Sequence, residues 1–469
     1  NPRVSRSSAL ASKATGVPIA RIASMLSIGH KLHELPNRVT GNTSAAFEPS
    51  IDYVVIKIPR WPFDKFKLAD RTLGTQMKST GETMAIGRSF EEALMKGWRS
   101  IGQGLGYPET IKWRKEKLEE KLRVPNDQRL TIIWNYLKRR NASPNRIQRT
   151  CELTDFHPFF IERIGELVKI ENKLEKIRKN IPKKILLKAK SNGFSDSHIS
   201  HLTGKKEETI RNQRKRMNIT SSFLMVDTCA GEFEAKTPYF YSTYLDQKSE
   251  YKIGKNIVIL GSGPIRIGQG IEFDYSTVHG VQAVRKAGYE AVVVNNNPET
   301  VSTDFDASDR LYFEPLDAES IFEILDVEKP YGIILQLGGQ TAVNLASEVE
   351  AYIQKEKLKT RILGTKVRDM DAAEDRGKCG ELMRKAGIKM PKWAIAKNSD
   401  EVITRAVEIG FPVLVRPSFV LGGRGMEIVH NDKQLKKYLR LETHATPKRP
   451  VLVDKFLEGA IELDVDLIS

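Results

Sequence analysis

The sequence predicts a chain of several domains, α/β at both ends and all-α in the middle. Residues 109–250 place apolar residues at three- and four-residue spacing, as in RIGELVKIENKLEKIRKNI, which is typical of amphipathic helices. From residue 256 onward, short β-branched runs alternate with helical patterns, which favours a parallel sheet through about residue 365. A length of 469 residues allows about three domains of ordinary size.

The expected elements follow in order along the chain. The first hundred residues contain a strand pattern at 50–59 and a helix pattern at 89–101, and the Gly/Pro-rich stretch GQGLGYP at 102–108 predicts a boundary. An all-helical segment is expected from there to residue 250. The strands expected after it are NIVIL (256–260), EAVVVN (290–295), YGIILQL (331–337), FPVLVRPS (411–418), MEIVH (426–430) and PVLVDKF (450–456).

The composition excludes several classes of protein. No stretch approaches the ~18–20 apolar residues of a membrane span, and no basic-then-apolar leader opens the chain, so we expect a cytoplasmic protein, with an organellar location left open. Cys151, Cys229 and Cys379 lack the spacing of a metal site and indicate a reducing compartment. The chain begins without Met and ends in an apolar alternation, which we interpret as a piece of a longer polypeptide.

The net charge of +16 lies almost entirely in one segment, because residues 109–216 contain 28 Lys and Arg against 14 Asp and Glu. Residues 193–219 have the sequence pattern of a helix-turn-helix. Its second helix would carry Arg211, Arg214, Lys215 and Arg216 and could enter a major groove. The alternative is a helical hairpin with a solvated basic face, the usual fate of a charge run. DNA binding is the second hypothesis, and it predicts an affinity that falls steeply with salt.

The run NIVIL leads into the glycine turn LGSGPIRIGQGIEFDY at 260–275. A dinucleotide fingerprint would need a third glycine where Arg266 stands and an acid where the second strand ends in Asn295, and a P-loop would need GK[ST]. Gly-, Thr- and Asn-rich turns also follow the next two strands, at 297–315 and 338–346. The carboxyl ends of parallel strands meet at one edge, so we expect the three turns to converge on one crevice. A tight turn without a ligand is the alternative.

Several long motifs resemble one family. The stretch GSGPIRIGQGIEFDYSTVHGVQAVRKAGYEAVVVNNNPETVSTDFDASDRLYFEP closely resembles the start of the second synthetase unit of the carbamoyl-phosphate synthase large subunit. The opening NPRVSRSSALASKATG is similar to the end of the first unit's ATP-grasp site, and FEPSIDYVVIKIPRW and QMKSTGETMAIGRS continue that match. VDTCAGEFEAKTPYFYSTY (226–244) resembles the segment that closes the helical oligomerisation domain. The resemblance covers the whole chain and is looser from 105 to 190.

The resemblance implies a domain order and a reaction. Residues 1–102 would be the C-terminal part of the first (carboxyphosphate) ATP-grasp unit and 103–250 the oligomerisation domain. Residues 251–370 would be a Rossmann-like pre-ATP-grasp domain of the second (carbamoyl phosphate) unit, and 371–469 the start of its ATP-grasp domain. The family makes carbamoyl phosphate from bicarbonate, ammonia and two ATP for arginine and pyrimidine biosynthesis. It is an ATP-dependent ligase, and we expect the isolated chain to be inactive because both sites are incomplete.

The resemblance also implies site residues. Arg416 and a glycine loop of Gly422 and Gly423 would bind phosphate, as would Arg376 at a helix start. The alternative for the glycine loop is an ordinary hairpin turn, and the alternative for Arg376 is a solvated charge on a helix. The implied ligands are ATP and Mg²⁺ or Mn²⁺, with K⁺ as a further candidate. Residues 453–466 would form a hinge strand, which could equally be an edge strand; in it Lys455 and Leu457 would contact the base and Glu462 the ribose. In the first site, Asn1 would be a metal ligand and Arg3 a phosphate ligand.

The resemblance further implies a role for three charged residues of the glycine turn and a set of partners. Arg266, Glu272 and Asp274 would shape the floor of the crevice and the internal route of the unstable intermediates. The implied partners are a glutamine amidotransferase, as a small subunit or a fused domain, and further copies of the chain through the helical domain. We expect neither a membrane nor a nucleic acid as partner.

Overall fold

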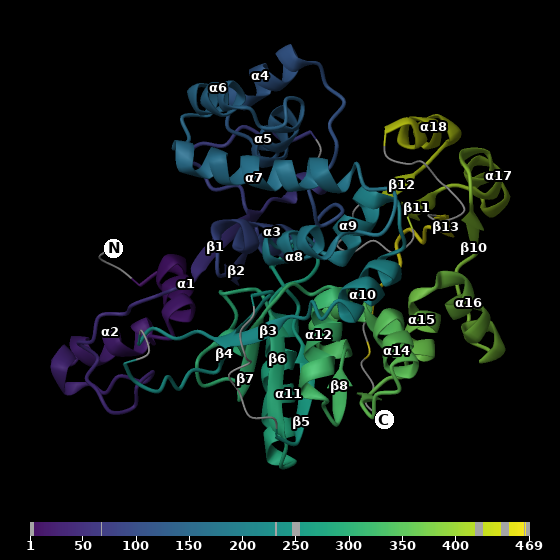
Figure 1. The fold of residues 1–469 in the computed structure, drawn as a ribbon. Coiled ribbons are helices and arrows are strands. Elements are labelled where there is room, and N and C mark those ends of the chain that lie inside the picture. Colours follow the sequence, from purple (N-terminus) through teal and green to yellow (C-terminus); the bar gives the residue numbers. More distant parts are fainter. Residues whose placement is uncertain are drawn as a thin grey trace. The chain divides into compact units, whose positions relative to one another are not determined.

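Two structural units make up the chain in the computed structural model (Figure 1). Unit 1 comprises residues 1–266 and 270–364, and unit 2 comprises residues 267–269 and 365–469. The structure describes residues 4–66, 68–229, 232–245, 254–417, 425–441, 450–463 and 465, without the side chains of Arg376, Pro417 and Leu441.

Short helices and an antiparallel pair of strands open unit 1. The first helix ends where Gly16 takes a φ of +71°, a conformation that glycine adopts without strain. Helix α3 begins after Ser89, whose hydroxyl accepts a hydrogen bond from the Glu92 amide, and it packs on both strands. The elements are α1 (Arg6–Thr15), α2 (Ile19–Ser27), η1 (Leu32–Glu34), β1 (Val54–Arg60), η2 (Pro62–Asp64), β2 (Gly81–Gly87) and α3 (Phe90–Ser100).

A helical bundle follows, as the sequence predicts (Figure 1). Proline stands at the first position of two of its helices, where the missing N–H is no loss. Apolar residues at three- and four-residue spacing, such as Leu118 and Leu122 or Ile161 and Ile164, are buried together in one core. The helices are α4 (Lys115–Arg123), α5 (Arg129–Lys138), α6 (Pro144–Thr154), α7 (Pro158–Leu174), α8 (Lys183–Ser191), α9 (Asp196–Thr203) and α10 (Glu207–Arg216).

The prediction of helix up to residue 250 is wrong for its last part. Strands β3 (Ser222–Met225) and β4 (Tyr239–Thr243) pair antiparallel, and β4 pairs parallel with β7 (Arg310–Phe313). Both strands are short and aromatic, with Phe223 and Tyr241 buried. Their aromatic content is the strand signal that the basic, helical composition of the preceding segment obscured.

A seven-stranded sheet in the order β3-β4-β7-β6-β5-β8-β9 forms the rest of unit 1. The strands from β4 to β9 are parallel, which confirms the predicted parallel sheet. The chain passes from β5 to β6 on one side and later to β8 on the other, so a topological switch point lies at the carboxyl end of β5. The remaining elements are β5 (Asn256–Leu260), α11 (Glu272–Lys286), β6 (Glu290–Asn295), η3 (Val301–Thr303), α12 (Ala318–Glu328), β8 (Gly332–Ile334), η4 (Gln336–Gly338), α13 (Gly339–Val343), α14 (Ala346–Lys355) and β9 (Arg361–Leu363).

Unit 2 contains a four-stranded antiparallel sheet in the order β10-β13-β11-β12. Its core holds Val413, Val415, Val451 and Val453 from the two central strands, covered by Tyr438 and other side chains of the helices. No helix in the described part of the chain is long and apolar enough to cross a membrane. The elements are α15 (Val367–Glu374), α16 (Arg376–Lys385), β10 (Trp393–Ala396), α17 (Ser399–Ile409), β11 (Val413–Pro417), β12 (Glu427–Val429), α18 (Asp432–Leu441) and β13 (Val451–Lys455).

Candidate functional site

The three turns at the carboxyl ends of β5, β6 and β8 meet, as predicted. The Asn295 side-chain oxygen, at the end of β6, accepts a hydrogen bond from the Gly263 amide at 3.1 Å. A Cβ at Gly261 would lie 2.6 Å from the Asn295 side chain, so only glycine allows this approach. From the third turn, the Thr341 hydroxyl donates to the Ser262 carbonyl at 3.0 Å. The asparagine that ruled out a dinucleotide site therefore holds two of the turns together.

Asp274 and Glu272 stabilise the turns through backbone amides. The buried Asp274 carboxylate accepts hydrogen bonds from the amides of Val301 at 2.7 Å and Ser302 at 3.0 Å, so α11 is tied to the second turn. Glu272 accepts from the Gly270 amide at 2.9 Å. The individual contribution of these two carboxylates, which the sequence left open, is to fix the backbone around the crevice.

Arg266 connects the glycine turn to the third turn. Its guanidinium donates to the Thr341 hydroxyl at 3.0 Å. Burial lowers the pKa of Arg266, and the nearby Arg60 lowers it further while Asp64 acts in the opposite direction. Arg266 is therefore a partly buried cation at the edge of the sheet where the three turns meet.

Strand β2, from the start of the chain, packs against the first two of these turns. The Met84 amide donates to the Asn296 carbonyl at 2.8 Å. At Gly81 a Cβ would clash with the backbone of Ile265 in the glycine turn, so the close approach of the two backbones requires glycine. Two segments almost two hundred residues apart in the sequence thus form one wall.

Helix α1 holds the second turn from another direction. Lys13 is 4% exposed, and its ammonium donates to the carbonyls of Pro298 at 2.7 Å and Thr300 at 2.9 Å. The same ammonium lies 2.9 Å from the Asp304 carboxylate. A buried lysine with three oxygen partners fixes the turn to the helix. Sequence reasoning missed Lys13, because no pattern distinguishes it from a solvated helix lysine.

Ionised side chains gather where α1 and β2 meet the second turn. Arg6 lies 3.0 Å from the Glu299 carboxylate, and Lys57 pairs with Glu82 on the facing strand. Burial raises the pKa of Glu299, and the charge of Glu82 raises it further, against the effect of Arg6. The surroundings of the second turn are therefore polar and carry both signs of charge.

In unit 2, Arg416 lies on β11 opposite Leu452 of β13. Its guanidinium pairs with the Asp454 carboxylate at 2.7 Å. The Arg416 Nε atom is buried, and it has no acceptor among the residues that the structure describes. An N–H group in this position suits a phosphate oxygen, since buried donors normally find a partner.

The residues predicted to hold the nucleoside lie at the end of β13 and beyond it. The ammonium of Lys455 donates to the carbonyls of Gly410 and Phe411 at 2.9 and 2.8 Å. The strand ends at Lys455, so Leu457, 55% exposed, and the exposed Glu462 lie in the irregular segment after it rather than in the long strand expected from 453 to 466.

The remaining predicted site residues are only partly visible. Arg376 begins α16, after Asp375 whose carboxylate accepts from the Lys378 amide at 3.0 Å, but its own side chain is not described. A helix start is the predicted position for a phosphate contact. Asn1, Arg3, Gly422 and Gly423 lie outside the described residues.

The segment that resembled a helix-turn-helix packs inside unit 1. Arg214 of α10 has no exposed surface. Its guanidinium donates to Asp196 of α9 at 2.9 Å and to Glu323 of α12 at 2.5 Å. Burial opposes its charge, yet Tyr244 and the two carboxylates raise the pKa of Arg214 above its ordinary value. The helical hairpin is thereby joined to the sheet part of the unit.

Two other cations of this segment also contact side chains of unit 1. Arg211 lies over the ring of Phe322 at 4.6 Å, and Lys215 pairs with Asp326 at 2.8 Å. Arg216 alone of these four side chains is exposed. A recognition helix must present its cations to a groove, so the DNA-binding hypothesis is not supported by the geometry.

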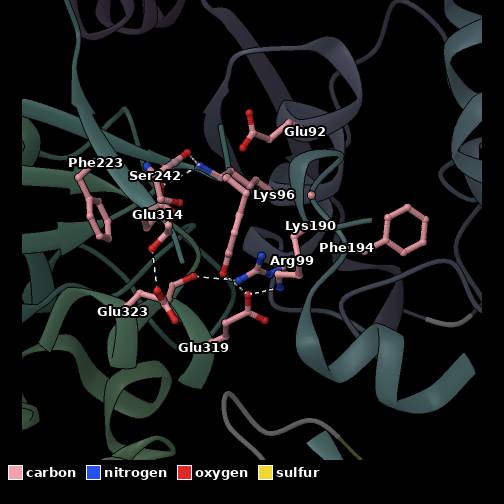
Figure 2. A pocket seen from close by; sticks show the side chains of 14 residues that line it. Glu92, Lys96, Arg99, Lys190, Phe194, Phe223, Ser242, Glu314, Glu319 and Glu323 are labelled. Atoms are coloured by element: carbon pink, nitrogen blue, oxygen red, sulfur yellow. Dashed lines mark hydrogen bonds and ion pairs between the residues drawn. The ribbon is translucent and has the colours of Figure 1, made fainter. Parts of the chain in front are cut away.

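Figure 2 shows the buried charges that continue from this hairpin to α3. Lys96 lies 2.8 Å from Glu314, and Lys190 lies 2.5 Å from Glu319. Such a network is stable only when every member is paired, so it fixes how the parts of unit 1 fit together. We call it the ionic junction, and it consists of Lys96, Arg99, Lys190, Asp196, Arg214, Glu314, Asp317, Glu319 and Glu323.

Three family models together match most of the chain. The carbamoyl phosphate synthase preATP-grasp domain matches residues 254–372, and the carbamoyl-phosphate synthetase large chain oligomerisation domain matches 82–218. The carbamoyl-phosphate synthase L chain ATP binding domain matches 1–35 and 375–469. The chain belongs to the carbamoyl-phosphate synthase large-chain family. This confirms the resemblance and the fold class that the sequence motifs predicted, including its ATP-grasp parts.

The carbamoyl-phosphate synthase relatives match over the full length of the chain. The large chain of Methanothrix thermoacetophila is 51% identical and that of Methanosarcina acetivorans 50%, each over 100% of this chain. The chain spans 43% of the length of each relative. A solved biotin carboxylase domain of the 2-oxoglutarate carboxylase of Hydrogenobacter thermophilus has a TM-score of 0.34 and 22% identity over 44% of this chain and 45% of that one, too low a likeness to carry an argument.

Proposed function

We propose that this chain is part of an enzyme that makes carbamoyl phosphate from bicarbonate, ammonia and two ATP. The observation that carries the proposal is the identity to carbamoyl-phosphate synthase large chains at about half of the aligned positions over the whole length of the chain. The three turns that meet at the switch point of the parallel sheet support it, because ligands of such sheets bind at the carboxyl ends of the strands. The product would serve arginine and pyrimidine biosynthesis.

The chain would contribute parts of two synthetase units. Residues 1–102 would end the first unit, 251–370 would form the pre-ATP-grasp domain of the second, and 371–469 would start its ATP-grasp domain. The helical oligomerisation domain between them, predicted to reach residue 250, would end near Arg216, because β3 and β4 belong to the sheet. Arg6 and Lys13 would then join the first unit to a turn of the second.

Binding of ATP in unit 2 would rest on positioning and charge. Arg416, held by Asp454, would donate to phosphate oxygens, and Arg376 would do so from its helix start. Gly422 and Gly423 would cover the phosphates with backbone amides. For the nucleoside, Lys455 and Leu457 would contact the base, chiefly through the backbone because the Lys455 ammonium is bound elsewhere, and Glu462 would accept from the ribose.

The family reaction also needs Mg²⁺ or Mn²⁺, and K⁺ is a further candidate. Metal ions would neutralise the terminal phosphates. Within the described ranges no group of three or more His, Cys, Asp or Glu side chains is placed to hold a metal ion. We therefore derive no step of the reaction through a metal from this chain. Asn1, as a metal ligand of the first site, and Arg3, as a phosphate contact there, stay predictions.

The proposed partners follow from the family. A glutamine amidotransferase, separate or fused, would supply ammonia, and the helical domain would bring copies of the chain together. In the crevice of unit 1, Arg266 and the charged wall of Glu82 and Glu299 would line the internal route of the intermediates. Asp274 and Glu272 would act only by fixing the turns.

The proposed function is tested by comparing this chain with the full-length protein that contains it. Each is incubated with ATP, Mg²⁺, bicarbonate and ammonia, and carbamoyl phosphate is trapped with ornithine and its transcarbamoylase. We expect the full-length protein to consume two ATP per product and this chain alone to give no product above a blank. A full-length protein without product would overturn the function, whereas product from the chain alone would overturn the view that its sites are incomplete.

A further inference from the structure

A cavity of about 580 Å³ lies in unit 1. It is bounded by β1 and α3 on one side and by α5 and the loop after α3 on the other. This volume is within the range of sites for small organic molecules, which often lie between two parts of a protein. None of the site residues that the sequence predicts lines it.

The wall of this cavity is largely aromatic and aliphatic. Trp61, Trp98, Tyr107 and Phe156 line it together with aliphatic side chains such as Leu130. Trp98 is already supported from behind by the ring of Trp134, 6.2 Å away, so it forms a fixed surface. Large, rigid aromatic walls favour a flat or branched apolar body over water.

Two of the three cations that line the cavity are neutralised by neighbours. Arg71 forms a two-bond ion pair with Asp127, and Lys57 pairs with Glu82. The acid that remains at the cavity is Glu109, which is exposed. After these two pairs, one lining cation, Arg129, and the Glu109 carboxylate are left without an ion pair among the described residues.

The third cation, Arg129, has no carboxylate partner within 4.0 Å among the described residues. Its Nε and one terminal nitrogen donate to the carbonyls of Leu122 and Thr154, both at 3.0 Å. Its guanidinium lies over the ring of Phe156 at 5.2 Å. Burial lowers the pKa of Arg129, and only the more weakly acting Asp155 opposes this. A positive charge that is partly desolvated beside apolar walls attracts an anion.

We propose that this cavity binds an amphipathic organic anion, with its apolar or aromatic body between Trp61 and Trp98 and its anionic group on Arg129. Arg129, which has no ion pair among the described residues, lies beside apolar walls, and this selects an amphipathic anion over neutral ligands, which leave the cation without an anion, and over phosphates, which lack a body for the aromatic wall. The site uses none of the residues assigned to ATP, and it shares only Lys57, the partner of Glu82, with the charged residues described beside the second turn.

The probe for this site is 8-anilinonaphthalene-1-sulfonate, an aromatic anion, and N-phenyl-1-naphthylamine is its neutral analogue. Both are titrated into the full-length protein, with their fluorescence and energy transfer from tryptophan as readouts. We expect Arg129→Met to weaken binding of the anion roughly tenfold or more, the effect of one charged hydrogen bond, and to leave the neutral analogue within about twofold. Leu130→Trp, which fills the cavity, should remove both probes.

The matched control is Arg140→Met, which removes an exposed arginine just beyond α5 that does not line the cavity. It should leave both probes unchanged. Anion binding that survives Arg129→Met, or binding of both probes that survives Leu130→Trp, would overturn the proposal. Binding to the present chain but not to the full-length protein would do the same, since another part of the protein would then occupy the cavity. Loss of both probes with Arg129→Met would place the effect on the fold rather than on the anion and would also contradict it.

Discussion

Replacing Arg214 with methionine tests the ionic junction most sharply. The change keeps a long apolar stem and removes the guanidinium that donates to Asp196 and Glu323. Arg214 and Asp196 have no exposed surface. Two buried carboxylates therefore lose a cation that water cannot replace.

The expected magnitude follows from the contacts that remain. Removing one partner of a buried ion pair destabilises a protein by about 3–5 kcal/mol. Asp196 keeps Lys190 at 3.1 Å, and Glu323 keeps the Ser221 hydroxyl at 2.7 Å. We therefore expect the lower end, about 3 kcal/mol, which is roughly a hundredfold change in the folding equilibrium.

The assay is denaturant unfolding of unit 1 followed by tryptophan fluorescence, together with hydrogen exchange of the amides of α9 and α10. Arg216→Met is the matched control on the same helix, and because Arg216 is exposed it should change neither measurement. A loss below about 1 kcal/mol for Arg214→Met, or an equal loss for Arg216→Met, would refute the role given to the junction.

Three further predictions concern other positions of unit 1. His198 is stacked between Tyr107 and Phe194, and burial lowers its pKa to about 3, below its unfolded value of 6.5. The unfolding free energy therefore falls as the pH drops from 6.5 toward 3, because the unfolded chain binds a proton that the buried His198 does not. Between pH 7 and pH 5 this decrease is about 2 kcal/mol, and it should be absent in His198→Phe. An unchanged pH profile in the variant would contradict this. Lys13→Met should destabilise the contact of α1 with the second turn by about 2–4 kcal/mol, measured as faster proteolysis of the N-terminal helices, whereas Arg21→Met, at an exposed pair, should have no such effect. Gly261→Ala should lower the unfolding free energy by about 1–3 kcal/mol through its clash with Asn295, while Gly74→Ala, with open space around it, should not; equal effects would argue against the packing of the turns.

The sequence was sufficient for features that depend on local pattern. The turns after β5, β6 and β8 could be placed at one edge because parallel strands end on the same side, and the hydrogen bonds of Asn295 and Thr341 confirm their convergence. Apolar spacing likewise identified the helices from 115 to 216, since a helix buries one stripe of its surface.

The partners of charged residues could not be predicted, because they depend on which surfaces meet. The excess of positive charge at 109–216 indicated a face that is exposed to solvent or bound to DNA. Lys190 and Arg214 are instead buried against carboxylates of α12, which lies more than a hundred residues further along the chain. Lys13 is a similar case, as its three oxygen partners lie in the turn at 298–304. Local sequence records the charge of a side chain but not what covers it.

The most direct test of the central claim, that unit 2 belongs to the second phosphorylation site, is Arg416→Ala in the full-length protein. Two partial reactions are measured, the phosphorylation of carbamate and the hydrolysis of ATP that depends on bicarbonate, with Arg405→Ala as a control at an exposed arginine of α17. Loss of one charge-assisted phosphate contact should slow the first reaction by roughly a hundredfold and leave the second largely unchanged. Equal loss of both reactions, or of neither, would contradict the assignment.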